Sequence, residues 1–155
     1  KAEDGRDCLP QMVAGVLDKV ADMTVFLNPV VESYARFGGH KAPKYISWSH
    51  ENRSQLVRIP AAVGEYRRAE LRSPDPAANP YLAFALMIQA GLLGMEQNLE
   101  LPPATDLNLY QADGASLSRL QPLPQDREAA VAVARSSEFI QSAVPAAVAE
   151  EYFKG

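Results

Sequence analysis

The residues best suited to chemistry are Arg68, Glu70 and Arg72, which occupy every second position after Tyr66 in one short segment. In an extended strand, side chains two positions apart share a face and lie about 7 Å from each other. The sequence therefore predicts a carboxylate between two guanidinium groups on one strand face. A carboxylate suits a hard divalent cation, and guanidinium groups suit phosphate or carboxylate ligands. Alternating charge is also typical of a solvated strand face, so both interpretations are open from this pattern alone.

Basic residues gather around this segment. Residues 36–72 contain eight of the fifteen Lys and Arg residues and only three acids, which leaves a local charge of +5 in a chain of net charge -4. The acids are Glu51, Glu65 and Glu70, and the basic residues are Arg36, Lys41, Lys44, Arg53, Arg58, Arg67, Arg68 and Arg72. Such a cluster favours anionic small-molecule substrates. The acidic balance of the whole chain argues against a dedicated nucleic-acid binder, which needs a basic face.

The elements expected to position these residues include both strands and helices. Alternation and β-branched content predict strands at 44–49, 55–60 and 66–73. Apolar periodicity predicts helices at 9–23, from Pro80 to about Asn98, at 125–136 and at 144–153. Asn79 is the expected N-cap of the second of these helices, which is apolar almost all round and is predicted to be buried in the core. Residues 32–43 are predicted to form a loop, and residues 101–124 a long exposed excursion.

Cysteine usage and hydropathy indicate the compartment. The single Cys8 cannot form an internal disulfide, and no run of eighteen apolar residues is uninterrupted. We therefore expect a soluble protein of the reducing cytoplasm, without a membrane partner.

Several ordered motifs contain the residues singled out above. They are Asn28-Pro29-x-x-x-Ser33-Tyr34-x-Arg36, Ala42-Pro43, Trp48-Ser49-x-x-Asn52-Arg53-Ser54-x-x-x-Arg58-Ile59-Pro60, Arg68-x-Glu70-x-Arg72-x-Pro74-Asp75-Pro76-x-x-Asn79-Pro80-Tyr81-Leu82-Ala83, and Ala90-Gly91-Leu92-x-Gly94. In order and spacing they closely resemble the C-terminal catalytic region of glutamine synthetase. The resemblance begins at about Leu9 and corresponds to the last third of a family member.

The resemblance implies a fold and an activity. Residues 1–155 are interpreted as a C-terminal fragment of the glutamine synthetase catalytic domain. The implied fold is α+β, with three antiparallel strands from an incomplete barrel sheet flanked by helices. The implied activity of the full-length parent is ATP-dependent ligation of ammonia to the side-chain carboxylate of glutamate through an acyl phosphate. The resemblance also implies Mg²⁺ or Mn²⁺ as cofactor and a dodecameric assembly of the parent. The fragment alone is expected to be inactive, because the remaining metal ligands of the family lie upstream.

The resemblance also implies a role for each matching residue. Glu70 matches a metal ligand. Arg53 and Arg72 match catalytic arginines that contact the transferring phosphoryl group and the side-chain carboxylate of the substrate. Arg36 matches the arginine that binds the carboxylate of the amino-acid substrate. Arg58 and Arg68 match arginines associated with the nucleotide phosphates.

Two departures from the family pattern leave alternatives open. Lys41 stands where family members usually carry a flap glutamate that helps deprotonate ammonium, and a lysine repels that cation. Glu32 or Glu51 could substitute, the acceptor could be another amine, or the parent could be a non-catalytic homologue with a regulatory role. A family lysine associated with ATP is missing between 60 and 67. Tyr110 matches a tyrosine that some bacterial members adenylylate, but its flanking residues favour an ordinary loop tyrosine.

Overall fold

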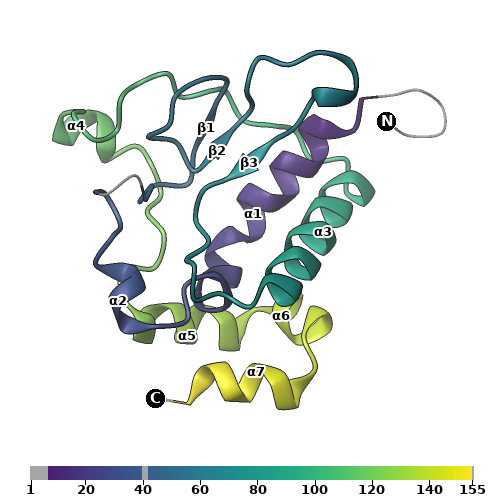
Figure 1. Ribbon diagram of the computed structural model, residues 1–155. Helices are drawn as coiled ribbons and strands as arrows, with labels where there is room; N and C mark the ends of the chain where they lie inside the picture. Colours follow the sequence, from purple (N-terminus) through teal and green to yellow (C-terminus); the bar gives the residue numbers. More distant parts are fainter. Residues whose placement is uncertain (1–6, 40–41, 155) are drawn as a thin grey trace.

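The computed structural model describes residues 7–39 and 42–154, apart from the side chain of Glu65. Its elements, in chain order, are α1 (Leu9–Leu27), α2 (Val31–Tyr34), β1 (Trp48–Ser49), β2 (Val57–Arg58), a 3₁₀ turn η1 (Gly64–Tyr66), β3 (Glu70–Leu71), α3 (Pro80–Glu96), α4 (Gly114–Leu117), α5 (Arg127–Ser136), α6 (Glu138–Ala143) and α7 (Ala146–Phe153). Helices and a small sheet together make an α+β fold. Helices α1 and α3 lie side by side at its centre, with the sheet above them and α5 to α7 below (Figure 1).

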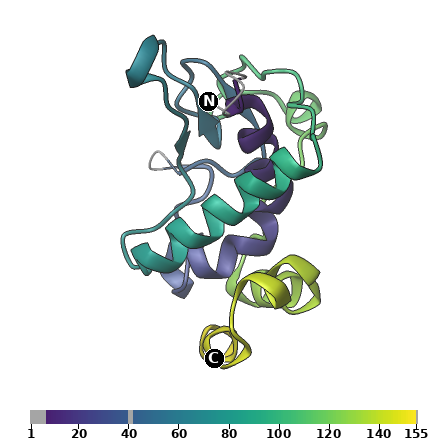
Figure 2. The same cartoon turned by 90° about the vertical axis from the view of Figure 1, so that its right-hand side faces the viewer.

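Helices α1 and α3 cross at unusually short range because glycines occupy the contact. A Cβ atom added to Gly15 would lie 2.1 Å from the carbonyl oxygen of Ala90 and 2.8 Å from the Cα atom of Gly94. Figure 2 shows α3 lying across α1 at this contact. The helix that follows the Asn79 cap starts as predicted, since the side chain of Asn79 accepts hydrogen bonds from the backbone N–H groups of Tyr81 and Leu82.

The prediction that α3 is buried all round is wrong. Its buried residues, Ala83, Leu86, Ala90, Gly91 and Gly94, form one stripe along the helix. On the rest of its surface, Tyr81 is 85% exposed, Phe84 62% and Ile88 56%. Because the composition is apolar on every face, periodicity could not tell which stripe packs against α1.

The strands of the sheet are shorter than expected, and one pair runs in a different relative direction. The strand order is β1-β2-β3; β2 and β3 pair antiparallel, but β1 and β2 pair parallel. The prediction of three antiparallel strands is therefore wrong for β1, and the three described strands do not close into a barrel. Alternation predicts which residues share a face, not the direction of neighbouring strands. Here residues 50–56 loop back before β2, so that both strands run the same way.

The segment 101–124 is largely exposed, as its composition predicts, but it is also attached to the sheet. The Trp48 indole Nε1 donates to the Pro102 carbonyl at 2.6 Å, and the Thr105 N–H donates to the Trp48 carbonyl at 2.8 Å. Leu123 is 1% exposed, and its N–H donates to the carbonyl of Lys44. The segment therefore covers one edge of the sheet and holds Trp48 as a packing residue.

The C-terminal part of the chain is helical, as expected for 125–136 and 144–153, with α6 as an additional short helix. Ser137 separates α5 from α6 and caps the latter by accepting a hydrogen bond from the N–H of Ile140. Within the described residues, no helix is both long enough and apolar enough to cross a lipid bilayer.

Candidate active site

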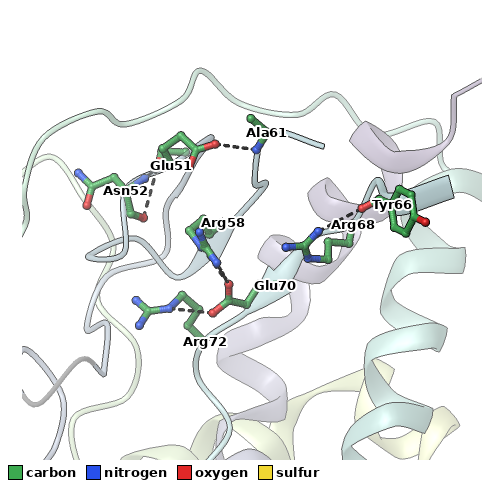
Figure 3. A network of polar contacts seen from close by, with 9 residues as sticks. Glu51, Asn52, Arg58, Ala61, Tyr66, Arg68, Glu70 and Arg72 are labelled. Atoms are coloured by element: carbon green, nitrogen blue, oxygen red, sulfur yellow. Dashed lines mark hydrogen bonds and ion pairs between the residues drawn. The ribbon is translucent and has the colours of Figure 1, made fainter. Parts of the chain in front are cut away.

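Glu70 lies between two arginines at the edge of the sheet. Its Oε2 atom accepts hydrogen bonds from Nε of Arg58 at 2.9 Å and from Nη2 of Arg58 at 2.5 Å. Its Oε1 atom accepts one from Nε of Arg72 at 3.3 Å. Figure 3 shows both guanidinium groups directed at the carboxylate. The side chains of Arg58 and Arg72 are only 15% and 10% exposed, whereas that of Glu70 is 41% exposed.

Strand pairing explains this arrangement. In the antiparallel register of β2 and β3, Arg58 lies directly opposite Glu70. Arg72 is two positions beyond Glu70 on the same side of the chain, and its backbone N–H donates to the carbonyl of Leu56 at 2.9 Å. Two arginines from two different strands thus contact one carboxylate.

Hydrogen bonding to Arg58 lowers the pKa of Glu70 from its usual 4.5, and the charges of Arg58 and Arg72 act in the same direction, against a smaller effect of burial. Glu70 is therefore ionised at neutral pH. An ionised carboxylate between guanidinium groups leaves a net positive site that suits an anionic ligand.

Glu70 should make stability depend on pH in a defined direction. Because its pKa is lower in the folded state than in the unfolded chain, the stabilisation is present at neutral pH and is lost as the pH falls through the folded pKa. We expect the difference in free energy of unfolding between wild type and Glu70→Gln to shrink as the pH falls from about 5 toward 2. Urea unfolding of the chain at several pH values measures it, and a difference that does not change with pH would contradict the assignment.

The structure does not bring every predicted site residue to Glu70. Arg68 is exposed, and its Nη1 donates to the backbone carbonyl of Tyr66 at 3.2 Å, away from the carboxylate (Figure 3). The 3₁₀ turn at Gly64–Tyr66 keeps Tyr66 out of the strand, so the predicted shared face is reduced to Glu70 and Arg72. Arg53 is also exposed, and within the described part of the chain its side chain forms no hydrogen bond or ion pair with Glu70.

Tyr110 lies close to the arginines. Its hydroxyl donates to the backbone carbonyl of Arg53 at 3.5 Å. Burial raises the pKa of Tyr110, and the nearby charge of Arg72 partly offsets that effect. The loop that carries Tyr110 is fixed to the 52–55 turn, because Ser54 Oγ accepts from the N–H of Leu109 at 2.9 Å and Gln55 Nε2 donates to the carbonyl of Leu107 at 2.8 Å.

Arg36 belongs to a neighbouring group that sequence reasoning missed. Its guanidinium contacts Asp75, through Nε at 2.9 Å from Oδ2, and Asn28, whose Oδ1 accepts from Nη2 at 3.1 Å. Asn28 and Asp75 both occur in the motifs quoted above, but neither is assigned a role there. Their occurrence in the same ordered motifs as Arg36 was the available signal.

Comparison with known proteins gives the family. A family model described as "Glutamine synthetase, catalytic domain" matches residues 2–155. The chain belongs to the glutamine synthetase family. Similar curated relatives include the glutamine synthetase of Methanosarcina mazei, 41% identical over 143 residues, which covers 90% of this chain and 32% of that protein. The glutamine synthetase of Staphylococcus epidermidis is 41% identical over 141 residues, covering 89% and 32%.

Solved structures agree with this family. One described as a GmaS/ADP complex superposes with a TM-score of 0.81 at 31% identity, covering 99% of this chain and 36% of the other. Another, described as apo GmaS without ligand, gives a TM-score of 0.77 at 30% identity, covering 99% and 34%. This glutamine synthetase family chain thus spans about a third of the length of the relatives it matches.

The described residues of this family member offer only part of a divalent-metal site. Glu70 supplies one carboxylate with the oxygen chemistry that Mg²⁺ or Mn²⁺ needs. Within residues 7–39 and 42–154, no group of three His, Cys, Asp or Glu side chains could hold a metal ion. Glu70 thus offers a divalent cation one carboxylate ligand, and the described residues do not gather further carboxylate, histidine or cysteine ligands into a group of three.

Of the residues considered for proton transfer, the structure describes Glu51 and Glu32, and neither shares a hydrogen bond or ion pair with a described site residue. Lys41, at the position of the family's flap glutamate, lies outside the described residues. Glu51 is exposed, and its Oε1 accepts a hydrogen bond from the N–H of Ala61 at 2.6 Å. Glu32 is exposed on α2.

Proposed function

We propose that this chain supplies the arginine-rich part of an active site that joins ammonia to the side-chain carboxylate of glutamate, using ATP. Membership of the glutamine synthetase family supports the reaction class. The observation that carries the proposal is the pair of shielded guanidinium groups, Arg58 and Arg72, on one ionised carboxylate. This arrangement suits a reaction in which negative charge must be bound and held in place.

The reaction has two steps. The side-chain carboxylate of glutamate attacks the terminal phosphorus of ATP, and the bond to ADP breaks to form an acyl phosphate. Ammonia then attacks the acyl carbon, loses a proton, and displaces inorganic phosphate to leave an amide. Phosphoryl transfer is accelerated mainly by positioning and by neutralisation of charge on the phosphoryl oxygens.

The arginines are proposed to bind the anionic groups of the substrates. Arg72 contacts the transferring phosphoryl group and the reacting carboxylate. Arg53 contacts the same two groups after its exposed side chain turns inward. Arg58 contacts nucleotide phosphates, and Arg68 joins it when ATP is bound. Arg36 holds the carboxylate of the amino-acid substrate. Mg²⁺ or Mn²⁺, when bound with Glu70 as one ligand, would neutralise further charge on the phosphates.

A specific residue favours a second candidate. Lys41 replaces the acid that would help deprotonate ammonium, so the acceptor could instead be another primary amine that binds in its neutral form. This alternative keeps the same ATP chemistry and the same arginines, and it differs only in the nucleophile.

The test uses the full-length protein that contains this chain. ADP formation is measured with glutamate and Mg²⁺, first with ammonium and then with a panel of primary amines. Saturable ADP formation with ammonium supports the proposal, and a preference for an organic amine supports the second candidate. No ADP formation with any acceptor, before or after Lys41→Glu, would contradict both and indicate a non-catalytic homologue.

The 155-residue chain by itself is predicted to be inactive. It spans about a third of its relatives, and its described residues supply a single carboxylate to the candidate site. We expect phosphate release by the purified chain with ATP, Mg²⁺, glutamate and ammonium to equal the background without protein. Release that requires both glutamate and ammonium would show that the chain is sufficient.

A further inference from the structure

Arg36 is held on one side by two different acceptors. Its Nε atom lies 2.9 Å from Oδ2 of Asp75 in an ion pair, and one hydrogen of its Nη2 atom is donated to Oδ1 of Asn28 at 3.1 Å. The Asp75 side chain is 11% exposed and Asn28 is completely buried, whereas the side chain of Arg36 is 30% exposed. The contacts to Arg36 are therefore shielded, while the arginine itself is partly open to solvent.

Both acceptors are fixed by further hydrogen bonds. Asn28 is the C-cap of α1; its N–H donates to the carbonyl of Thr24 at 2.8 Å, and its Nδ2 donates to Oγ of Ser73 at 3.2 Å. The N–H of Asp75 donates to the carbonyl of Leu27 at 2.8 Å, and its Oδ1 accepts from the N–H of Ala77 at 2.8 Å. The acceptors are thus attached to the end of α1 and to the residues that directly follow Arg72.

The remaining donors of Arg36 define what it can bind. A guanidinium group has five N–H donors in a fixed planar fork. Asp75 forms an ion pair on the Nε side and Asn28 takes one Nη2 hydrogen, and among the described residues no other hydrogen bond or ion pair of this guanidinium is formed. Both Nη1 hydrogens and one Nη2 hydrogen remain, and this end of the fork matches a carboxylate that binds through two parallel hydrogen bonds.

We propose that Asp75 and Asn28 are positioning residues that orient Arg36 so that its Nη1 end receives the carboxylate of the amino-acid substrate. This inference rests on the proposed function, because it takes Arg36 as the residue that binds that carboxylate. Asp75 carries one negative charge and Asn28 carries none. Together they therefore supply a single negative charge to the positively charged Arg36. Since Ser73 and Asp75 follow Arg72 closely in sequence, the same contacts tie the carboxylate-binding arginine to the strand that carries Arg72.

The test measures ligand binding, so that it does not depend on catalysis. Glutamate and ADP are titrated separately by calorimetry into the full-length wild type and into Asp75→Asn, Asp75→Glu, Ser73→Ala and Glu150→Gln. Asp75→Asn is isosteric and keeps the acceptor for Ala77, so we expect it to fold, which its thermal midpoint checks. Glu150 forms an exposed ion pair with Arg135 and serves as the matched carboxyl-to-amide control.

We expect the glutamate Kd of Asp75→Asn to rise about tenfold or more, because the charged partner that lies 2.9 Å from Nε of Arg36 is lost. The ADP Kd should stay within about twofold, Asp75→Glu should recover part of the glutamate affinity, and Ser73→Ala should weaken it less. An unchanged glutamate Kd in Asp75→Asn, or equal weakening for glutamate and ADP, would overturn the inference. If the wild type binds glutamate but forms no ADP, the proposed ligase activity is refuted, while the binding data still decide whether Asp75 positions Arg36. If the wild type binds no glutamate, the ligase proposal and the positioning role are both refuted.

Discussion

Replacing Glu70 by glutamine in the full-length protein is expected to lower ADP formation about a hundredfold or more. The carboxylate of Glu70 is the shared acceptor of Arg58 and Arg72, whose side chains are 15% and 10% exposed. An amide is neutral and presents one acceptor oxygen, so it cannot hold both guanidinium groups as an ionised carboxylate does. Misplacement of groups that stabilise a phosphoryl-transfer transition state carries costs of this size.

The measurement is the steady-state rate of ADP release at saturating ATP and glutamate, with ammonium or whichever amine proves active. Glu150→Gln, in the exposed pair with Arg135, is the control and should keep its rate within about twofold. Arg58→Lys should also be impaired, because an ammonium group cannot reproduce the two hydrogen bonds of this guanidinium to Glu70. Full activity in Glu70→Gln would show that Glu70 is not part of the active site.

Gly15→Ala is expected to destabilise the fold by about 3 kcal/mol or more. The added methyl group would lie 2.1 Å from the carbonyl oxygen of Ala90 and 2.8 Å from the Cα atom of Gly94. These are backbone atoms of a helix, so no flexible side chain can move aside. The two helices would have to separate, and the contact between α1 and α3 would lose its close packing.

Urea unfolding of the wild type and the variant measures this loss. Gly114→Ala is the matched control, because Gly114 begins α4 and a Cβ atom there would meet nothing within 4 Å. It should change the free energy of unfolding by less than about 1 kcal/mol, since alanine is also the better helix former. Equal effects of the two substitutions would show that the glycine contact between α1 and α3 is not what limits stability.

Local features of the chain could be predicted from sequence because they depend on neighbours in the chain. The Asn79 cap, the start of α3 and the placement of Glu70 and Arg72 on one side of a strand follow from backbone geometry over two or three residues. The ordered motifs also predicted the glutamine synthetase family, which the family model confirms. The proposed roles of the individual arginines remain predictions.

Contacts between distant segments could not be predicted in the same way. Arg68 was expected beside Glu70, but the 3₁₀ turn at Gly64–Tyr66 shortens the strand and leaves this side chain on the Tyr66 carbonyl. Residues 101–124 have a loop composition, yet they pack on β1, because backbone groups of Trp48 and Lys44 are available at the sheet edge. Composition reports how polar a segment is, not which backbone groups remain for it to bind.

The sequence by itself determined the family, the starts of the main helices, and the charge pattern that places a carboxylate among arginines. Only the tertiary structure decided that Arg58, from another strand, contacts Glu70 while Arg68 bonds to the Tyr66 carbonyl instead, and that Asn28 and Asp75 hold Arg36. The physical reason is the separation along the sequence of the residues that interact. Capping and strand alternation act over a few residues, whereas each of these contacts depends on strand register or helix packing that brings together residues from 8 to 39 positions apart.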